Sequence, residues 1–144
     1  MGALWMADDW LILQFERFSH WFQRLTGRTN FFLAALCNLA SSAVCIALGF
    51  WTSISVYFVF SFFFLSFSIS DQYMEKHALV QLPRSYANPR KTIFFKILRI
   101  AFPFLTAAVL IFYWGVVSRA TNFGTAAITC LTWGSIYFEA CDPL

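Results

Sequence analysis

Apolar and charged positions are segregated along this chain into long blocks. No Asp, Glu, Lys or Arg occurs from Thr29 to Ser70, and further charge-free runs cover residues 100–118 and 120–138. A helix needs roughly 20 apolar residues to cross the hydrocarbon core of a bilayer, which is about 30 Å thick. The first run has the length of two such helices, and each later run has the length of one. The sequence therefore predicts four transmembrane helices.

The predicted fold is an all-α integral membrane protein, with one membrane domain over residues 1–144. We place its spans at residues 31–49, 52–70, 100–118 and 120–138, as two hairpins that turn at residues 49–52 and near Ser118. A single helix over the first two spans would be about 60 Å long, twice the membrane thickness. Two spans joined by a tight turn are therefore favoured there.

The segment before the first span, residues 8–25, has the pattern of an amphipathic helix. Its large apolar residues recur at spacings of four and three, which places them on one face: Leu11, Phe15, Phe18, Phe22 and Leu25. Asp8 or Asp9 suits the N-cap, and Gly27 suits the C-terminal stop. Such a helix can lie in the headgroup layer of a membrane. The alternative is that it packs on the cytoplasmic face of the protein itself.

The distribution of basic residues predicts the orientation. Three precede the first span, six lie between residues 71 and 99, and only Arg119 falls in a hairpin turn. Lys and Arg in short loops favour the cytoplasmic side, so both termini and the central loop over 71–99 are expected there. The cell membrane or an inner membrane is the expected location. Because these cations flank membrane spans, anionic lipid explains them and no nucleic-acid partner is expected.

Seven basic residues are candidates for contact with lipid headgroups, or with an acidic partner that binds the 71–99 segment. They are Arg17, Arg24, Arg28, Arg90, Lys91, Lys96 and Arg99.

Small and hydroxylated residues form rows at helical spacing in the first and fourth spans. Small residues let helix backbones approach closely, and hydroxyl groups bridge between helices. Two roles stay open: packing within one four-helix unit, or lining a pore at the axis of a homo-oligomer. Asn38 suits an interhelical hydrogen bond or a polar ring at a constriction. The residues with these roles are Asn38, Ser41, Ser42, Cys45, Gly49, Thr121, Thr125, Thr129 and Gly134.

Three single positions carry local expectations. Pro103 lies early enough in the third span to bend it without breaking it. Trp133 lies toward the end of the fourth span and suits an aromatic belt. Thr29 and Thr121 each precede an apolar run, where a threonine caps a helix.

Several kinds of chemistry are not expected. No charged residue is predicted at membrane depth, which disfavours proton-coupled transport. The four cysteines form no CxxC pair, the two histidines lack metal spacing, and no phosphate loop or nucleophile motif occurs. We therefore expect no enzyme activity, no metal and no cofactor.

The favoured function is a homo-oligomeric channel or membrane-permeabilising pore. The alternatives are a non-conducting scaffold or accessory subunit of a larger membrane complex, and a membrane-shaping hairpin protein.

Overall fold

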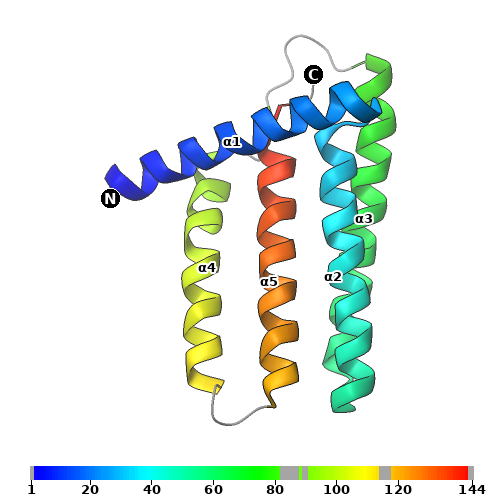
Figure 1. The fold of residues 1–144 in the computed structure, drawn as a ribbon, viewed down its shortest axis with the longest axis vertical. Helices are drawn as coiled ribbons and strands as arrows, with labels where there is room; N and C mark the ends of the chain where they lie inside the picture. The colour runs from blue at the N-terminus through cyan, green and yellow to red at the C-terminus, as the bar shows by residue number, and fades with distance from the viewer. Residues whose placement is uncertain (1, 82–87, 89–90, 114–117, 143–144) are drawn as a thin grey trace.

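The computed structural model describes residues 2–81, 88, 91–113 and 118–142. The described chain is all-helical, as predicted, and Figure 1 shows its five helices. They are α1 (Gly2–Thr26), α2 (Asn30–Thr52), α3 (Val56–Gln81), α4 (Ile93–Tyr113) and α5 (Arg119–Ala140).

Four helices stand side by side, and the fifth crosses one end of them. Helices α2 to α5 run roughly parallel or antiparallel to one another, and α1 lies across their shared end (Figure 1). Helix α2 packs against both α3 and α5, and α1 contacts α2, α4 and α5. Within the described chain, α4 contacts only α5 and α1. Helix α4 is therefore held along one side.

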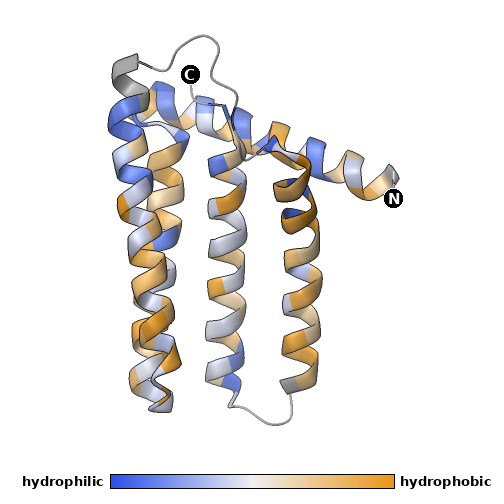
Figure 2. Ribbon diagram, turned by 180° about the vertical axis from the view of Figure 1, so that it is seen from behind, coloured by the Kyte–Doolittle hydropathy of each residue, from blue (hydrophilic) through white to orange (hydrophobic). Residues whose placement is uncertain are grey.

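Hydropathy separates these four helices. The stretches Asn30–Thr52 and Ile93–Phe112 are long and apolar enough to cross a membrane, and no other described helix meets that measure. Half of the α2 stretch is buried within the protein, but only 6% of the α4 stretch is. Figure 2 shows that α4 is strongly apolar along its length, whereas many residues of α5 have intermediate hydropathy.

Glycines set two of the closest helix contacts. A Cβ atom on Gly49 would lie 2.8 Å from Cζ of Phe58, and one on Gly124 would lie 2.7 Å from Cδ2 of Leu48. The first contact joins α2 to α3 and the second joins α5 to α2. Gly49 therefore belongs to a helix interface. The turn that was predicted at residues 49–52 lies beyond it, where Ser53 adopts a left-handed conformation with φ of 58°.

Two predictions about helix ends are confirmed. Thr29 is the N-cap of α2, and its hydroxyl group accepts a hydrogen bond of 3.3 Å from the N–H of Phe31. Gly27 follows the last residue of α1 with φ of +72°, a conformation that favours glycine.

Two other predictions about helix ends are wrong. Helix α1 begins at Gly2, so Asp8 and Asp9 lie inside it and cap nothing. Ser118 is the N-cap of α5, and its hydroxyl group accepts from the N–H of Thr121. Helix α3 continues past its predicted span to Gln81, as the sequence from Asp71 to about Leu82 predicts, and α4 begins at Ile93, before its predicted span.

Candidate functional site

A buried ion pair joins α1 to α4 where the two helices cross. Arg99 donates from Nε to Oδ1 of Asp8 at 2.9 Å and from Nη2 to Oδ2 at 2.8 Å. Tyr137 of α5 donates its hydroxyl to the same Oδ1 at 2.7 Å. All three residues are about 1% exposed. A bidentate pair of this kind fixes orientation as well as distance, so α1 has one defined position across the bundle.

The ion pair determines the protonation of Asp8. Burial alone would raise the pKa of this carboxyl, but the hydrogen bonds from Arg99 and Tyr137 outweigh it and hold the pKa below its ordinary value. Lys96 adds a smaller effect in the same direction. The docked state of α1 thus favours the carboxylate over the carboxylic acid.

The backbone of Arg99 is held by a second contact. Pro103 lies inside α4 and has no N–H, so the carbonyl four residues earlier, that of Arg99, has no donor within the helix. The indole Nε1–H of Trp133 donates to this carbonyl at 3.1 Å. Trp133 therefore joins α5 to α4, and the aromatic-belt position expected of it stays a prediction.

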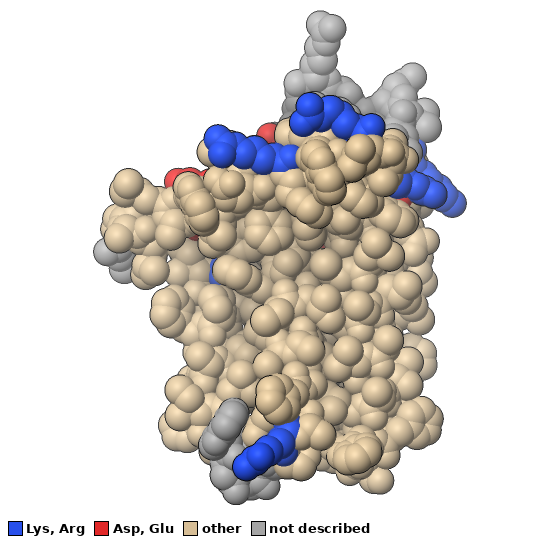
Figure 3. Space-filling view, in the orientation of Figure 1, with Lys and Arg blue, Asp and Glu red and all other residues tan. Residues whose placement is uncertain are grey.

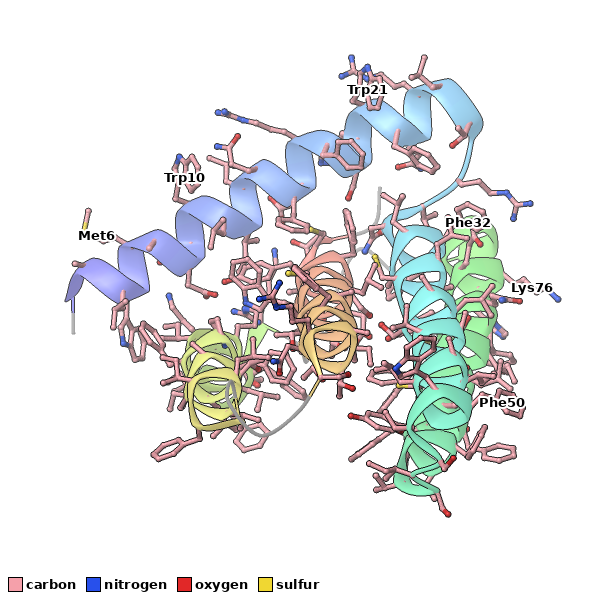
Figure 4. All side chains as sticks on the ribbon, turned by 60° about the horizontal axis from the view of Figure 1, so that its bottom comes forward. Met6, Trp10, Trp21, Phe32, Phe50 and Lys76 are labelled. Carbon is pink, nitrogen blue, oxygen red and sulfur yellow. The ribbon has the colours of Figure 1, made fainter. Side chains whose placement is uncertain are left out.

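Aromatic rings fill the space between α1 and α5. The ring of Phe15 stacks on that of Tyr137 with centroids 5.1 Å apart, and meets Phe138 edge-on at 4.8 Å. The opposite side of α1 is exposed, and Figure 4 shows Met6, Trp10 and Trp21 pointing away from the bundle. Helix α1 thus packs on its own protein through one face. Contact of α1 with the headgroup layer stays a prediction.

Further ion pairs surround the buried one. Lys96 Nζ lies 2.6 Å from Oδ1 of Asp9, and Lys91 Nζ lies 3.1 Å from Oε1 of Glu16 and 2.5 Å from Oδ2 of Asp142. Burial would lower the pKa of Lys91, but the bonds to Asp142 and Glu16 raise it above its ordinary value. Figure 3 shows acidic and basic side chains gathered at this end of the molecule.

The ion pairs involve several of the basic residues that were expected to contact lipid headgroups. Lys91, Lys96 and Arg99 are bonded within the protein, and Arg28 pairs with Glu75 at 3.5 Å while staying half exposed. Arg17 and Arg24 are exposed on α1. Arg90 lies outside the described residues.

A seam of polar contacts joins α2 to α3. Asn38 Nδ2 donates to Oδ2 of Asp71 at 2.9 Å, and the hydroxyl groups of Ser42 and Ser61 lie 2.9 Å apart. The hydroxyl of Ser68 donates to the carbonyl of Ala35. All of these contacts are buried. Asp71 is the first residue of the segment 71–99 that was assigned to the cytosolic side, and it is buried within α3.

Asparagines complete the C-terminal end of α5. The last carbonyls of a helix have no partner within it. Asn30 donates to the carbonyls of Phe138 and Cys141, and Asn88 donates to those of Glu139 and Cys141. The thiol of Cys141 is buried and donates to the carbonyl of Tyr137 at 3.2 Å, and burial raises its pKa to about 12.

A lateral groove opens between α3 and α4, with α5 as its floor. Its volume is about 630 Å³. Aromatic and aliphatic residues of α3 and α4 form its walls, among them Phe60, Phe64, Phe102 and Val109. The predicted row Thr121, Thr125 and Thr129 lines its floor together with Thr132.

The hydroxyl groups of this threonine row are bonded inside their own helix. Thr125 donates to the carbonyl of Thr121 at 2.9 Å, Thr129 to that of Thr125 at 2.8 Å, and Thr132 to that of Ile128 at 2.7 Å. They need no further partner from the groove. The other predicted positions lie in helix contacts: Ser41, Ser42 and Cys45 are buried, and Gly134 faces Cys37.

No protein-family model, curated protein or solved structure matches this chain. Within the described part of the chain, no group of three or more His, Cys, Asp and Glu side chains is arranged to hold a metal ion.

The Trp133 contact generates a prediction about stability. Trp133→Phe removes the donor to the Arg99 carbonyl and should lower the free energy of unfolding in detergent by about 1–3 kcal/mol. Pro103→Ala restores a backbone N–H to that carbonyl. The cost of Trp133→Phe should therefore be smaller in the Pro103→Ala background, as measured by a double-mutant cycle. Equal costs in both backgrounds would refute the compensation.

The Asp8 carboxylate generates a prediction about pH. Its lowered pKa stabilises the fold above the ordinary value of 3.8, and this contribution is lost as pH falls through the lower folded-state pKa. At pH 7, Asp8→Asn leaves Arg99 buried without its counter-charge and should cost about 3–5 kcal/mol. Below pH 3.8, thermal unfolding should show a smaller difference between Asp8→Asn and the parent protein.

Asp9→Asn is the matched control, because Asp9 is the exposed neighbour with an ion pair at the rim. It should cost under about 1 kcal/mol. An equal cost for the two substitutions at pH 7 would contradict the role given to the buried pair.

Proposed function

We propose that this chain is a non-enzymatic, non-conducting scaffold subunit of a larger membrane complex. Helices α2 to α5 span the membrane, and α1 lies at the cytoplasmic surface beside both termini. The observation that carries the proposal is the internal pairing of its membrane-depth polar groups: Asn38 with Asp71, Ser42 with Ser61, and each groove threonine with its own helix.

The four-span arrangement is supported by length and by charge. Helices α3 and α5 have 26 and 22 residues, which is enough to cross a bilayer alongside α2 and α4. In α3, Ser61, Ser68 and Asp71 are buried, and in α5 the threonine hydroxyl groups are bonded within the helix, as polar groups in lipid must be. The charged rim around α1 then lies at one membrane surface, and positive charge favours the cytoplasmic one.

Internal pairing favours a scaffold over the homo-oligomeric pore. A water-filled path needs polar groups that are free to solvate the conducted species. In this protein Asn38 is buried against Asp71, and the groove threonines donate to backbone carbonyls. The polar residues thus stabilise the fold of one subunit.

Helix α4 offers the face for a partner. It is held only by α5 and α1 within the described chain, and its outer side is strongly exposed, with Phe112 at 83%. Phe104, Leu105 and Ile111 extend the same apolar surface. In a membrane, a transmembrane helix of another protein can pack on this side through van der Waals contact.

Flux measurements test the non-conducting part of the proposal. Liposomes that contain the purified protein should hold ions and small dyes as well as protein-free liposomes do. Asn38→Leu should lower stability by roughly 0.6–1.7 kcal/mol, the range measured for hydrogen bonds between membrane helices, without changing flux. Reproducible flux that Asn38→Leu or Thr129→Val alters would instead establish the pore.

Co-purification from native membranes tests the scaffold part. The tagged protein should retain a second membrane protein in fixed ratio, and the double variant Phe104→Ala/Phe112→Ala should release it. Phe62→Ala/Phe63→Ala on the exposed side of α3 is the matched control and should not. Recovery of the protein only as a complex with itself would contradict the proposal.

A further inference from the structure

The lateral groove has a basic residue near one end. Arg119 is the first residue of α5, at the end of the bundle away from α1 (Figure 1). It lines a second hollow of about 310 Å³, together with Phe123 and Ala126. Leu110 and Asn122 line both this hollow and the groove, so the two spaces adjoin.

The charge around Arg119 is uncompensated. Every acidic residue of the chain lies in α1, in the second half of α3, or at or just after the C-terminal end of α5: Asp8, Asp9, Glu16, Asp71, Glu75, Glu139 and Asp142. Among the described basic residues, Arg119 is the only one at the opposite end. This end therefore presents one positive charge, which suits a ligand with one negative charge.

Asn122 lies one helical turn deeper than Arg119. Three residues correspond to about 4.5 Å along the helix axis. Asn122 is 6% exposed, and its side chain makes no hydrogen bond to another described residue. It lines both hollows, so its amide N–H groups are placed to donate to a ligand that brings a carbonyl oxygen.

Beyond Asn122 the groove suits a hydrocarbon chain. From Thr121 to Thr132 its floor runs for about 16 Å, close to half of the roughly 30 Å hydrocarbon core and hence to one leaflet. The threonine hydroxyl groups are bonded within α5, and the walls are largely aromatic and aliphatic. A transmembrane helix about 10 Å wide would occupy roughly 1,250 Å³ over this length, twice the groove volume of about 630 Å³.

We propose that this surface binds one anionic glycerophospholipid. Its phosphate pairs with Arg119, an ester carbonyl accepts from the amide of Asn122, and an acyl chain lies in the groove as far as Thr132. A headgroup with a net negative charge is preferred over a zwitterionic one, because no carboxylate at this end can pair with an ammonium group. The proposal needs the protein to be embedded in a membrane but does not depend on the scaffold function.

Native mass spectrometry of the purified full-length protein tests the site. The probes are phosphatidylglycerol, phosphatidylethanolamine and diacylglycerol with the same acyl chains. A single membrane-surface cation contributes about 1 kcal/mol, so phosphatidylglycerol should bind about fivefold more tightly than the other two. Arg119→Gln should remove this preference. Thr129→Phe, which fills the groove, should weaken binding of all three lipids.

The double variant Arg17→Gln/Arg24→Gln is the matched control at the other end and should leave phosphatidylglycerol binding unchanged. Loss of binding in this variant but not in Arg119→Gln would overturn the proposal and place the lipid beside α1. The protein could instead form a dimer that Thr129→Phe dissociates, with lipid binding unchanged. That result would overturn the proposal and show that a second copy of the chain occupies the groove. Arg119 is exposed, so Arg119→Gln should fold like the parent protein. It therefore tests the proposal even if Thr129→Phe does not fold.

Discussion

The ion pair between Asp8 and Arg99 is the constraint on which the arrangement of the five helices depends. Both side chains are buried, so neither charge is stable there without the other. Helix α4 touches only α5 and α1 within the described chain. Without the Asp8 carboxylate, α4 would lose its main polar link to α1. Tyr137 extends the same contact to α5, so one carboxylate coordinates three helices.

In the rest of the bundle, several buried polar groups have their partners inside the protein. Pro103 removes a backbone donor from α4, and Trp133 of α5 supplies one. The last carbonyls of α5 also lack a donor within their helix. The side-chain amides of Asn30 and Asn88 donate hydrogen bonds to them. A buried backbone carbonyl without a partner costs about 1–3 kcal/mol, so these side chains favour the helix arrangement that the structure has.

Much of the fold could be predicted from the pattern of charges and caps. The charge-free runs locate α2 and most of α3, α4 and α5, and Thr29 and Gly27 mark ends that the structure has. These signals are local, because a cap or a run of apolar residues acts within one helix.

The candidate site could be predicted only in part, because its contacts join distant segments. Asp8 resembles an N-cap when only its neighbours are considered, but its partner is Arg99, ninety-one positions later. The sequence indicates a polar role for Asn38 but places its partner Asp71 just beyond the end of the predicted span, because a charge usually marks the end of a span. Pro103 indicates from the sequence alone that the carbonyl of Arg99 needs a donor from outside α4. The residues near Pro103 in the sequence do not indicate that Trp133 is this donor.

The most direct test of the position of α1 is zero-length carbodiimide cross-linking in intact membranes, followed by peptide mass spectrometry. This reagent joins a carboxylate to an amine only where the two are in contact. The account predicts an amide link between Asp9 and Lys96, whose Oδ1 and Nζ lie 2.6 Å apart, alongside the link between Lys91 and Asp142. Recovery of the Lys91–Asp142 link without any link from α1 to α4 would contradict it.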